Sequence, residues 1–370
     1  MSFPKVDIQL QSGALGRFTD VGSGKAGFVV LMASADEPGD HAFGEVKSYS
    51  HLIDMPDELQ AVAALQLYFS LADGCETFIM PVVDTTTIAS VVYLSHASHY
   101  AEKLLDHDTS IRYIGVVGTL LLANLTTALT NAKALAAAYL DKIRPVIVAL
   151  PYSWVTADVL VDLSVATYNR VAAIVSYAGD EIGLFLGKRV SNQVHRNIGR
   201  VKDGALPIAS CLLDGHASPQ KDVANYMASV ETLHNKGYIT IRTYVGRTGY
   251  FFTDDPLACV AGDYSNVANQ AVIDKAFLIT YNTYVNEINE DVEVTTDGKL
   301  NPGVCKALQG NVETAIKNQM TGEISSVKAF VDESQNILTT QKIEVVLKIV
   351  PKGYSKEIVV KLGFDNPAIA

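Results

Sequence analysis

The sequence predicts an α/β fold with a mainly parallel sheet in its first half and an α+β arrangement in its C-terminal part. Five short apolar runs occur between residues 27 and 177, and longer helical patterns separate them. The runs are rich in β-branched residues, which is typical of strands buried on both faces of a parallel sheet. Strands and helices alternate through this half, an order that favours right-handed crossovers and about five strands.

The predicted elements of the first half follow one another in a regular order. The first helix follows Asp54 as its N-cap, carries Pro56 in its first turn and ends at Gly74. Apolar side chains recur inside it at i,i+4 spacing, which places them on one face. The strands are predicted over 27–32, 77–83, 113–117, 145–150 and 171–177, and the other helices over 87–105, 125–141 and 156–169.

The pattern changes after Gly179 and is weak through residues 188–200. A short strand over 206–213 and a helix over 223–236 follow, and period-two alternation then predicts a strand over 237–244. The last third predicts two long helices, over 267–289 and 302–320, and two strands, over 343–350 and 358–362.

The composition excludes several classes of protein. The 370 residues carry a net charge of −11, only 19% are charged, and 48% are hydrophobic. Such a chain is expected to bury a large core without disulfides or metals, and disorder is excluded. The acidic balance disfavours binding to nucleic acid phosphates or to an anionic membrane surface. No uninterrupted apolar run of about 18 residues is present to span a bilayer.

The N-terminal residues and the cysteines indicate one compartment. Residues 1–5 are followed by alternation and not by the apolar segment of a secretory signal, so the chain is expected to stay in the cytoplasm. The cysteines are far apart, with no CxxC pair and no metal-ligand spacing. They are expected to be reduced core residues: Cys75, Cys211, Cys259 and Cys305.

A glycine-rich segment near the N-terminus invites a phosphate-binding interpretation. Residues 22–27 read Gly-Ser-Gly-Lys-Ala-Gly, but Thr19 stands in place of the first Walker glycine, and Ala26 in place of the magnesium-binding hydroxyl. The segment also precedes a predicted strand instead of following one. No GxGxxG follows any predicted strand, so no cofactor is expected.

Other candidate catalytic and metal-binding motifs are incomplete. His96, His99 and Glu102 share a face of a predicted helix, but HExxH order is missing, and a solvated face is the favoured interpretation. Residues 325–328 spell SxxK without SDN or KTG partners. Asp254-Asp255 precede a proline, which is more typical of an Asx turn than of a metal site. We therefore predict no catalytic residue and no metal site.

The two ends of the chain carry short alternating patterns. Each could close a sheet of its own chain, or it could add to the sheet edge of a neighbouring subunit. Five to seven main-chain hydrogen bonds, at about 0.5 to 1.5 kcal/mol net each, would give several kcal/mol for each linkage. The predicted linkage residues are Val6, Ile8, Leu10, Ile358, Val359, Val360 and Leu362, with the 343–350 strand among the acceptors.

Several segments together carry a family resemblance. Residues 59–83 place a helix, a glycine turn and a strand in an order that resembles the contractile tail sheath family. Residues 246–254 resemble the sheath motif in which glycine and aromatic residues precede an acidic turn. The C-terminal third is the most specific part, with Asp274-Lys275 in a long helix, Asn301-Pro302-Gly303 before a second helix to Met320, a strand around 327–331, Asp-Glu-Ser-Gln-Asn-Ile-Leu at 332–338, and Ile349-Val350-Pro351 before a terminal strand.

The resemblance implies a structural protomer, not an enzyme, from the sheath of a tailed phage or a phage-tail-like contractile injection system. Such protomers stack as hexameric rings in a helical polymer, and contraction drives an inner tube through a cell envelope, as in viral genome ejection. The implied partners are other copies, the inner tail tube protein, and baseplate and tail terminator proteins, with no cofactor, direct nucleic acid or membrane. Assembly in the bacterial cytoplasm and residence in a virion tail or injection particle are implied.

The resemblance also implies a division of the chain. An N-terminal linking arm would span 1–20, an α/β outer domain 21–236, a smaller C-terminal α/β sheath core domain 237–355, and a C-terminal linking arm 356–370.

A local charge imbalance predicts an electrostatic contact. Five lysines near the C-terminus oppose Glu344 and Glu357, a local net charge of +3 in an acidic protein. This surface could meet an acidic tube or an acidic patch of another copy. The lysines are Lys342, Lys348, Lys352, Lys356 and Lys361, and the acidic patch comprises Glu287, Glu290, Asp291, Glu293 and Asp297.

An alternative from another class is an α/β enzyme or ligand-binding domain built on residues 27–178, with a C-terminal oligomerisation domain. It predicts a defined oligomer and a pocket with convergent polar groups.

Overall fold

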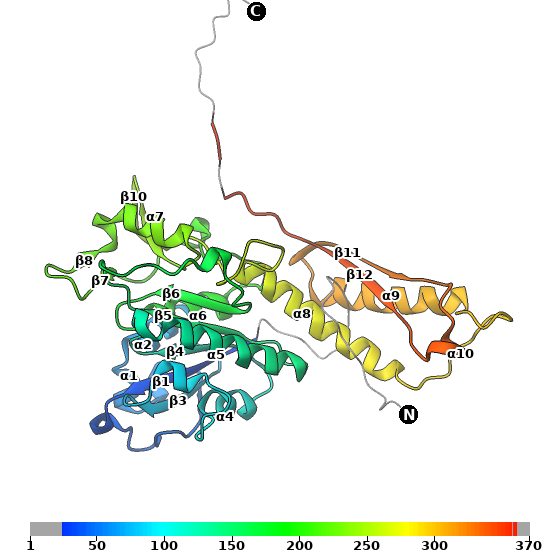
Figure 1. Cartoon of the computed structure of the whole chain (residues 1–370), viewed down its shortest axis with the longest axis horizontal. Coiled ribbons are helices and arrows are strands. Elements are labelled where there is room, and N and C mark those ends of the chain that lie inside the picture. The colour runs from blue at the N-terminus through cyan, green and yellow to red at the C-terminus, as the bar shows by residue number, and fades with distance from the viewer. Residues whose placement is uncertain (1–23, 357, 361–370) are drawn as a thin grey trace, which may run out of the picture.

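The computed structural model describes residues 24–356 and 358–360. Figure 1 shows a parallel sheet with helices on both faces, and beside it a C-terminal part in which long helices accompany a two-stranded ribbon. A single large cluster of buried apolar side chains runs from the sheet into the C-terminal part.

The sheet has six strands in the order β2-β3-β1-β4-β5-β6. All five strands predicted for this half are confirmed, and they pair in parallel. The strand that the sequence missed, β2, is a three-residue antiparallel edge with no apolar pattern. The bounds are β1 Lys25–Met32, β2 Lys47–Tyr49, β3 Thr77–Val83, β4 Ile111–Val117, β5 Ile147–Tyr152 and β6 Val171–Val175.

Two helices, α2 (Ala63–Ala72) and α6 (Glu181–Ser191), pack closely on one face of the sheet. A Cβ atom at Gly183 would lie 1.8 Å from the Ala64 carbonyl oxygen, so only glycine permits this approach. The sequence did not predict α6, because its two glycines lower helix propensity.

Helices α4 (Tyr100–His107) and α5 (Leu122–Asp141) cover the other face of the sheet. The Tyr139 hydroxyl of α5 donates to the Glu102 carbonyl of α4 at 3.3 Å. The predicted helix over 125–141 is confirmed as α5, which begins three residues earlier, at Leu122.

Three helix predictions were wrong in extent or kind. The first helix divides into α1 (Asp57–Gln60) and α2, and the 87–105 helix into α3 (Ile88–Val91) and α4. No α-helix forms over 156–169, where only a 3-10 turn, Leu163–Val165, is found. The Asp162 side chain there accepts the Ser164 amide at 3.1 Å, and such local side-chain bonds compete with helix formation.

Small hairpins and one helix lie beyond β6. Residue Ile239 pairs in parallel with Ile174, and the Ala258 amide donates to the Val171 carbonyl, so this part covers the edge of β6. The predicted strands over 206–213 and 237–244 shorten to β7 and β9. The bounds are β7 Leu212–Asp214, β8 Lys221–Asp222, α7 Met227–Asn235, β9 Ile241–Tyr244 and β10 Arg247–Phe252.

Helix α8 (Val267–Tyr284) connects the sheet to the C-terminal part and is buried on nearly all sides. Two successive residues of opposite charge attach it in two directions. Asp274 pairs with Arg170 beside β6 at 2.6 Å, and Lys275 pairs with Glu323 before β11 at 2.8 Å. All four side chains are less than 10% exposed.

The rest of the C-terminal part follows the predicted order. Helix α9 and strand β12 are confirmed, and the 267–289 helix ends earlier than expected, at Tyr284, before a 3-10 turn. The bounds are α9 Pro302–Gln319, β11 Ile324–Val331, α10 Ile337–Thr340 and β12 Val345–Pro351. The remaining 3-10 turns span Ser34–Asp36, Leu52–Asp54, Val201–Asp203, Val223–Asn225 and Val285–Glu287.

The cysteines are free, and three of the four are buried as predicted, whereas Cys75 is half-buried. None of the helices in the described ranges combines the length and apolar content needed to cross a membrane.

Candidate inter-subunit interface

The predicted linkage strands lie at the two ends of the chain. Ile358, Val359 and Val360 are 79%, 72% and 68% exposed and belong to no strand of their own protomer. Three successive exposed apolar side chains leave apolar surface free for a partner. The other predicted linkage residues lie outside the described ranges: Val6, Ile8, Leu10 and Leu362.

The predicted acceptor strand, β12, forms an antiparallel ribbon with β11. The register runs from Ile324 opposite Pro351 to Val331 opposite Val345. Among the described residues, no third strand pairs with this ribbon. On the β11 side, Glu313 of α9 accepts the Ala329 amide at 2.9 Å. The outer edge of β12 has no partner strand among the described residues, and such an edge is a template for an added strand.

The two faces of the ribbon differ in character. Val327 and Leu347 are buried, and β11 packs on α9. The opposite face exposes Phe330, which is 60% accessible and lies across from Val346. Lys328 and Lys348 face each other in the same register, a like-charge pair that is unfavourable in isolation.

Two of the predicted basic residues have carboxylate partners within the protomer. Lys342 pairs with Glu344 at 2.6 Å, and Lys356 pairs with Asp254 at 2.5 Å. Lys348 lies on the exposed ribbon face, and Lys352 is half-buried after β12. Lys361 and Glu357 are outside the described ranges. The contact of these lysines with an acidic surface stays a prediction.

The predicted acidic residues lie between the end of α8 and the start of α9. Glu287 ends the 3-10 turn that follows this helix, and the Glu293 carboxylate accepts the Asn301 side-chain amide at 3.2 Å. This loop lies at the end of α8 that points away from the six-stranded sheet (Figure 1). The remaining members are Glu290, Asp291 and Asp297.

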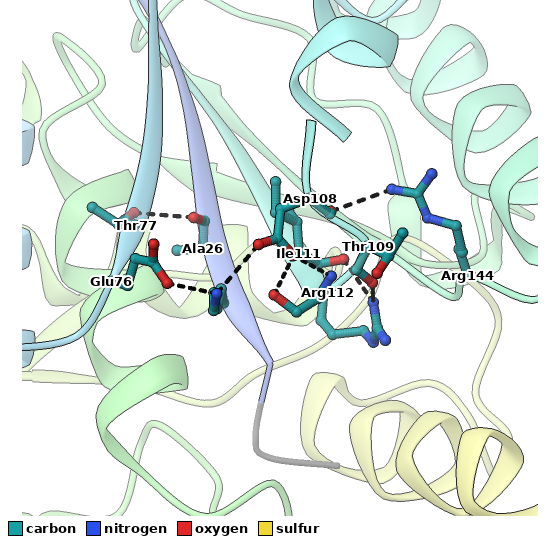
Figure 2. Close-up of polar contacts among 10 residues, drawn as sticks. Ala26, Glu76, Thr77, Asp108, Thr109, Ile111, Arg112 and Arg144 are labelled. Carbon is teal, nitrogen blue, oxygen red and sulfur yellow. Dashed lines mark hydrogen bonds and ion pairs between the residues drawn. The ribbon is translucent and has the colours of Figure 1, made fainter. Parts of the chain in front are cut away.

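A lysine at the start of β1 joins three strands of the sheet at the edge where they begin. Lys25 Nζ lies 2.6 Å from a Glu76 carboxylate oxygen and 3.3 Å from one of Asp108. Glu76 directly precedes β3, and Asp108 lies just before β4 (Figure 2). Arg144 supports this corner by donating to the Asp108 carbonyl at 3.3 Å. No sequence pattern marks this site, because Glu76 and Asp108 are 51 and 83 residues away from Lys25.

A second polar site holds the segment that follows β12. The Tyr354 hydroxyl donates to the His195 carbonyl, and Lys356 pairs with Asp254. Asn197 donates to the carboxylates of both Asp254 and Asp255, at 2.6 and 2.7 Å. This cluster joins segments 57 to 159 residues apart.

Asp255 connects that cluster to the start of α8. Its carboxylate accepts the Ala268 amide in the first turn of α8 at 2.9 Å, a contact between residues 13 apart and not the local Asx turn predicted from the sequence. Burial, with the charge of Asp254 beside it, raises the pKa of Asp255 to about 7.

Two glycines meet in the segments that follow β4 and β6. Gly179 approaches Gly118 so closely that a Cβ atom would lie 2.6 Å from the Gly118 amide nitrogen. The turn that contains Gly179 can make this approach only because residue 179 is glycine.

Next to that turn lies a buried acid, Glu181, at the start of α6. Its carboxylate accepts hydrogen bonds from the Ser176 hydroxyl and, at 3.6 Å, from the Cys211 thiol. Burial raises the pKa of Glu181 to about 7 and raises that of Cys211 well above its usual range. The thiol therefore stays protonated, which makes it a poor nucleophile.

Glu181 is expected to make stability fall as pH rises. The folded protein binds the proton of Glu181 more tightly than the unfolded chain does. The stabilisation that this proton provides is complete below the ordinary carboxyl pKa of 4.5 and is lost as the pH rises to about 7. The loss is on the order of 3 kcal/mol. Calorimetric unfolding of Glu181→Gln should show no difference from wild type near pH 4 and greater stability at pH 8. The exposed control Glu231→Gln should follow wild type throughout, and equal pH profiles for all three proteins would contradict the prediction.

The histidine site considered from sequence does not form. His99 lies before α4 with a positive φ of 47°, and its ring pairs with Glu102 at 2.5 Å, whereas His96 accepts the Ser98 amide. The prediction that these residues share a helical face was wrong, because the predicted 87–105 helix is interrupted between α3 and α4. Within the ranges that the structure describes, no three His, Cys, Asp or Glu side chains are grouped to hold a metal ion.

A comparison with protein families matches nearly the whole chain. A family described as DUF2586 matches in two parts, its N-terminal domain over residues 3–256 and its C-terminal domain over residues 263–369. No curated protein matches the sequence.

Two solved structures share the fold over 99% of this chain. One is the anti-feeding prophage (AFP) helical sheath in its contracted state, at 14% identity and a TM-score of 0.60, covered in full. The other is the PVC sheath complex of an extracellular contractile injection system, also contracted, at 10% identity and a TM-score of 0.60, with 98% of that chain covered. The resemblance drawn from sequence is therefore confirmed for the fold.

Proposed function

This chain belongs to the DUF2586 family, and from that premise we propose that it is the protomer of a contractile sheath. The observation that carries the proposal is the likeness to two contracted sheaths over 99% of the chain. A likeness limited to the parallel sheet would suit many α/β enzymes, but this one includes the C-terminal ribbon and its helices.

The surface of the protomer supports a role in polymers. Residues 358–360 expose three apolar side chains, and within the part of the chain that the structure describes no third strand pairs with the β11–β12 ribbon. We propose that strands at 6–10 and 358–362 add to the ribbon of neighbouring copies, with arms at 1–20 and 356–370, an outer domain at 21–236 and a core domain at 237–355. Added strands gain main-chain hydrogen bonds without any catalytic group.

The proposal extends to the assembly and its partners. Stacked hexameric rings would surround an inner tube, and the sheath would also contact baseplate and terminator proteins. Contraction would draw its energy from interfaces between protomers, so no catalytic step is required. Assembly in the bacterial cytoplasm, followed by residence in a phage tail or a related particle, is consistent with this role.

The purified 370-residue protein is expected to form rings or tubes of high mass as its concentration rises. Electron microscopy and sedimentation over a concentration series would detect them. The α/β enzyme alternative instead predicts one small oligomer under all conditions. A uniformly small species at every concentration and ionic strength would contradict the sheath proposal.

A further inference from the structure

Two lysines lie next to the proposed linking arms. Lys25 is the first residue of β1 and follows the proposed N-terminal arm at 1–20. Lys356 is the first residue of the proposed C-terminal arm at 356–370, beyond the end of β12. Each pairs with carboxylates from distant parts of the chain, as described above.

We propose that Lys25 and Lys356 are positioning residues that fix where the two linking arms leave the protomer. The inference rests on the proposed sheath function, because only a linked protomer has arms under load. A force on the N-terminal arm would be transmitted to β1 at the middle of the parallel sheet. A force on the C-terminal arm would be transmitted to the start of α8.

The N-terminal anchor is built from several groups. Lys25 contacts Glu76 and Asp108, and its backbone amide donates to the Ser110 carbonyl at 3.0 Å (Figure 2 shows the two carboxylates). Gly24 before it has a φ of 87°, and a Cβ there would lie 2.3 Å from Arg112 Cγ. The path of the chain into β1 is therefore fixed on both sides of the Gly24–Lys25 bond.

The pairing at this anchor agrees with the electrostatics. Burial opposes the charge of Lys25, but the hydrogen bonds to Glu76 and Asp108 outweigh it and raise the pKa of Lys25. For Asp108, burial is outweighed by hydrogen bonds from Ser110 and Lys25, and its pKa is lowered. Both groups are therefore charged at neutral pH.

The C-terminal anchor holds two residues of the segment after β12. Tyr354 bonds to the His195 carbonyl, and Lys356 pairs with Asp254, which Asn197 holds in place. Asp254 is only 9% exposed, so its carboxylate is a fixed point, whereas the apolar residues 358–360 are exposed. The chain thus changes from bound to exposed within a few residues, at the boundary expected of the root of an arm.

These pairs are too exposed to contribute much to folding of one protomer. The Lys25 side chain is 32% exposed and that of Lys356 56%, and such pairs are worth little on a surface. In a polymer the same contact recurs at every linkage, and it limits the freedom of an arm that a neighbour must bind. Loss of an anchor should therefore weaken assembly more than it weakens the fold.

The test compares Lys25→Met and Lys356→Met with Lys25→Arg, Lys356→Arg and the exposed control Lys202→Met. We expect each Met variant to raise the critical concentration for tube assembly about two- to fivefold, with an unchanged urea midpoint for the dissociated protomer. The Arg variants should assemble as wild type does, because they keep the charge.

The outcomes separate the two proposals. Wild-type tubes with equal critical concentrations for all variants would overturn the anchors alone. An equal loss of protomer stability and assembly in the Met variants, without rescue by Arg, would reduce the lysines to ordinary fold contacts and also overturn the inference. Absence of tubes from the wild type would overturn the sheath function together with the anchors.

Discussion

Deletion of residues 358–370 is expected to abolish sheath polymers while the protomer stays folded. The described part of this segment, residues 358–360, is exposed and contributes nothing to the buried core. In the polymer, the strand at 358–362 would pair with the ribbon of a neighbour, at several kcal/mol for each linkage. Because every protomer would lose the same linkage, the effect on assembly multiplies along the polymer. Electron microscopy and sedimentation would measure the loss of tubes, and circular dichroism would check the fold.

The matched control removes residues 363–370 only and keeps the proposed linkage strand. This variant should assemble nearly as well as wild type, and both deletions keep Lys356 and its bond to Asp254. Tubes of normal length from the protein that lacks 358–370 would show that the C-terminal strand does not link protomers.

The second large effect is expected from Arg170→Met. Arg170 and Asp274 are 6% and 8% exposed and pair at 2.6 Å, and Gln270 also donates to Asp274, at 2.8 Å. Removal of the arginine leaves a buried carboxylate with one neutral partner, which typically costs about 3 to 5 kcal/mol. Chemical denaturation should show that loss as a lower free energy of unfolding.

A double variant, Arg170→Met with Asp274→Leu, tests whether the unpaired charge is the cause. It should recover much of the stability, because an apolar pair of similar volume can replace a buried ion pair. The exposed Lys202→Met should behave as wild type. A double variant no more stable than Arg170→Met would assign the loss to packing around the arginine and contradict the electrostatic explanation.

The strands of the parallel sheet could be predicted because each is a local apolar run. β1 and β3 were recognised almost to the residue, since strands buried on both faces need apolar side chains throughout. The helices were harder to predict where local chemistry competes. Residues 156–169 contain enough apolar residues for a helix, but the Asp158 carboxylate accepts the Val155 amide and the Tyr152 hydroxyl, which holds a loop there.

In the candidate interface, too, local patterns could be predicted and contacts between distant residues could not. Alternation at 343–350 predicted the acceptor strand, and β12 formed there. The local charge of the predicted basic surface did not show that Lys342 and Lys356 have carboxylate partners within the protomer. One of these, Asp254, is 102 residues away from Lys356, and no pattern in a single sequence marks such a pair.

The sequence by itself determined the α/β class, the five parallel strands of the sheet, the long C-terminal helices and the resemblance to sheath proteins. Those features depend on periodicity and composition within short windows, which one sequence displays directly. Only the tertiary structure decided that Gly183 lets α2 and α6 meet, that Asp274 and Lys275 fasten α8 in two directions, and that Lys25 and Lys356 hold the roots of the terminal segments. These features depend on contacts between residues far apart in the chain, and such contacts exist only after the chain has folded.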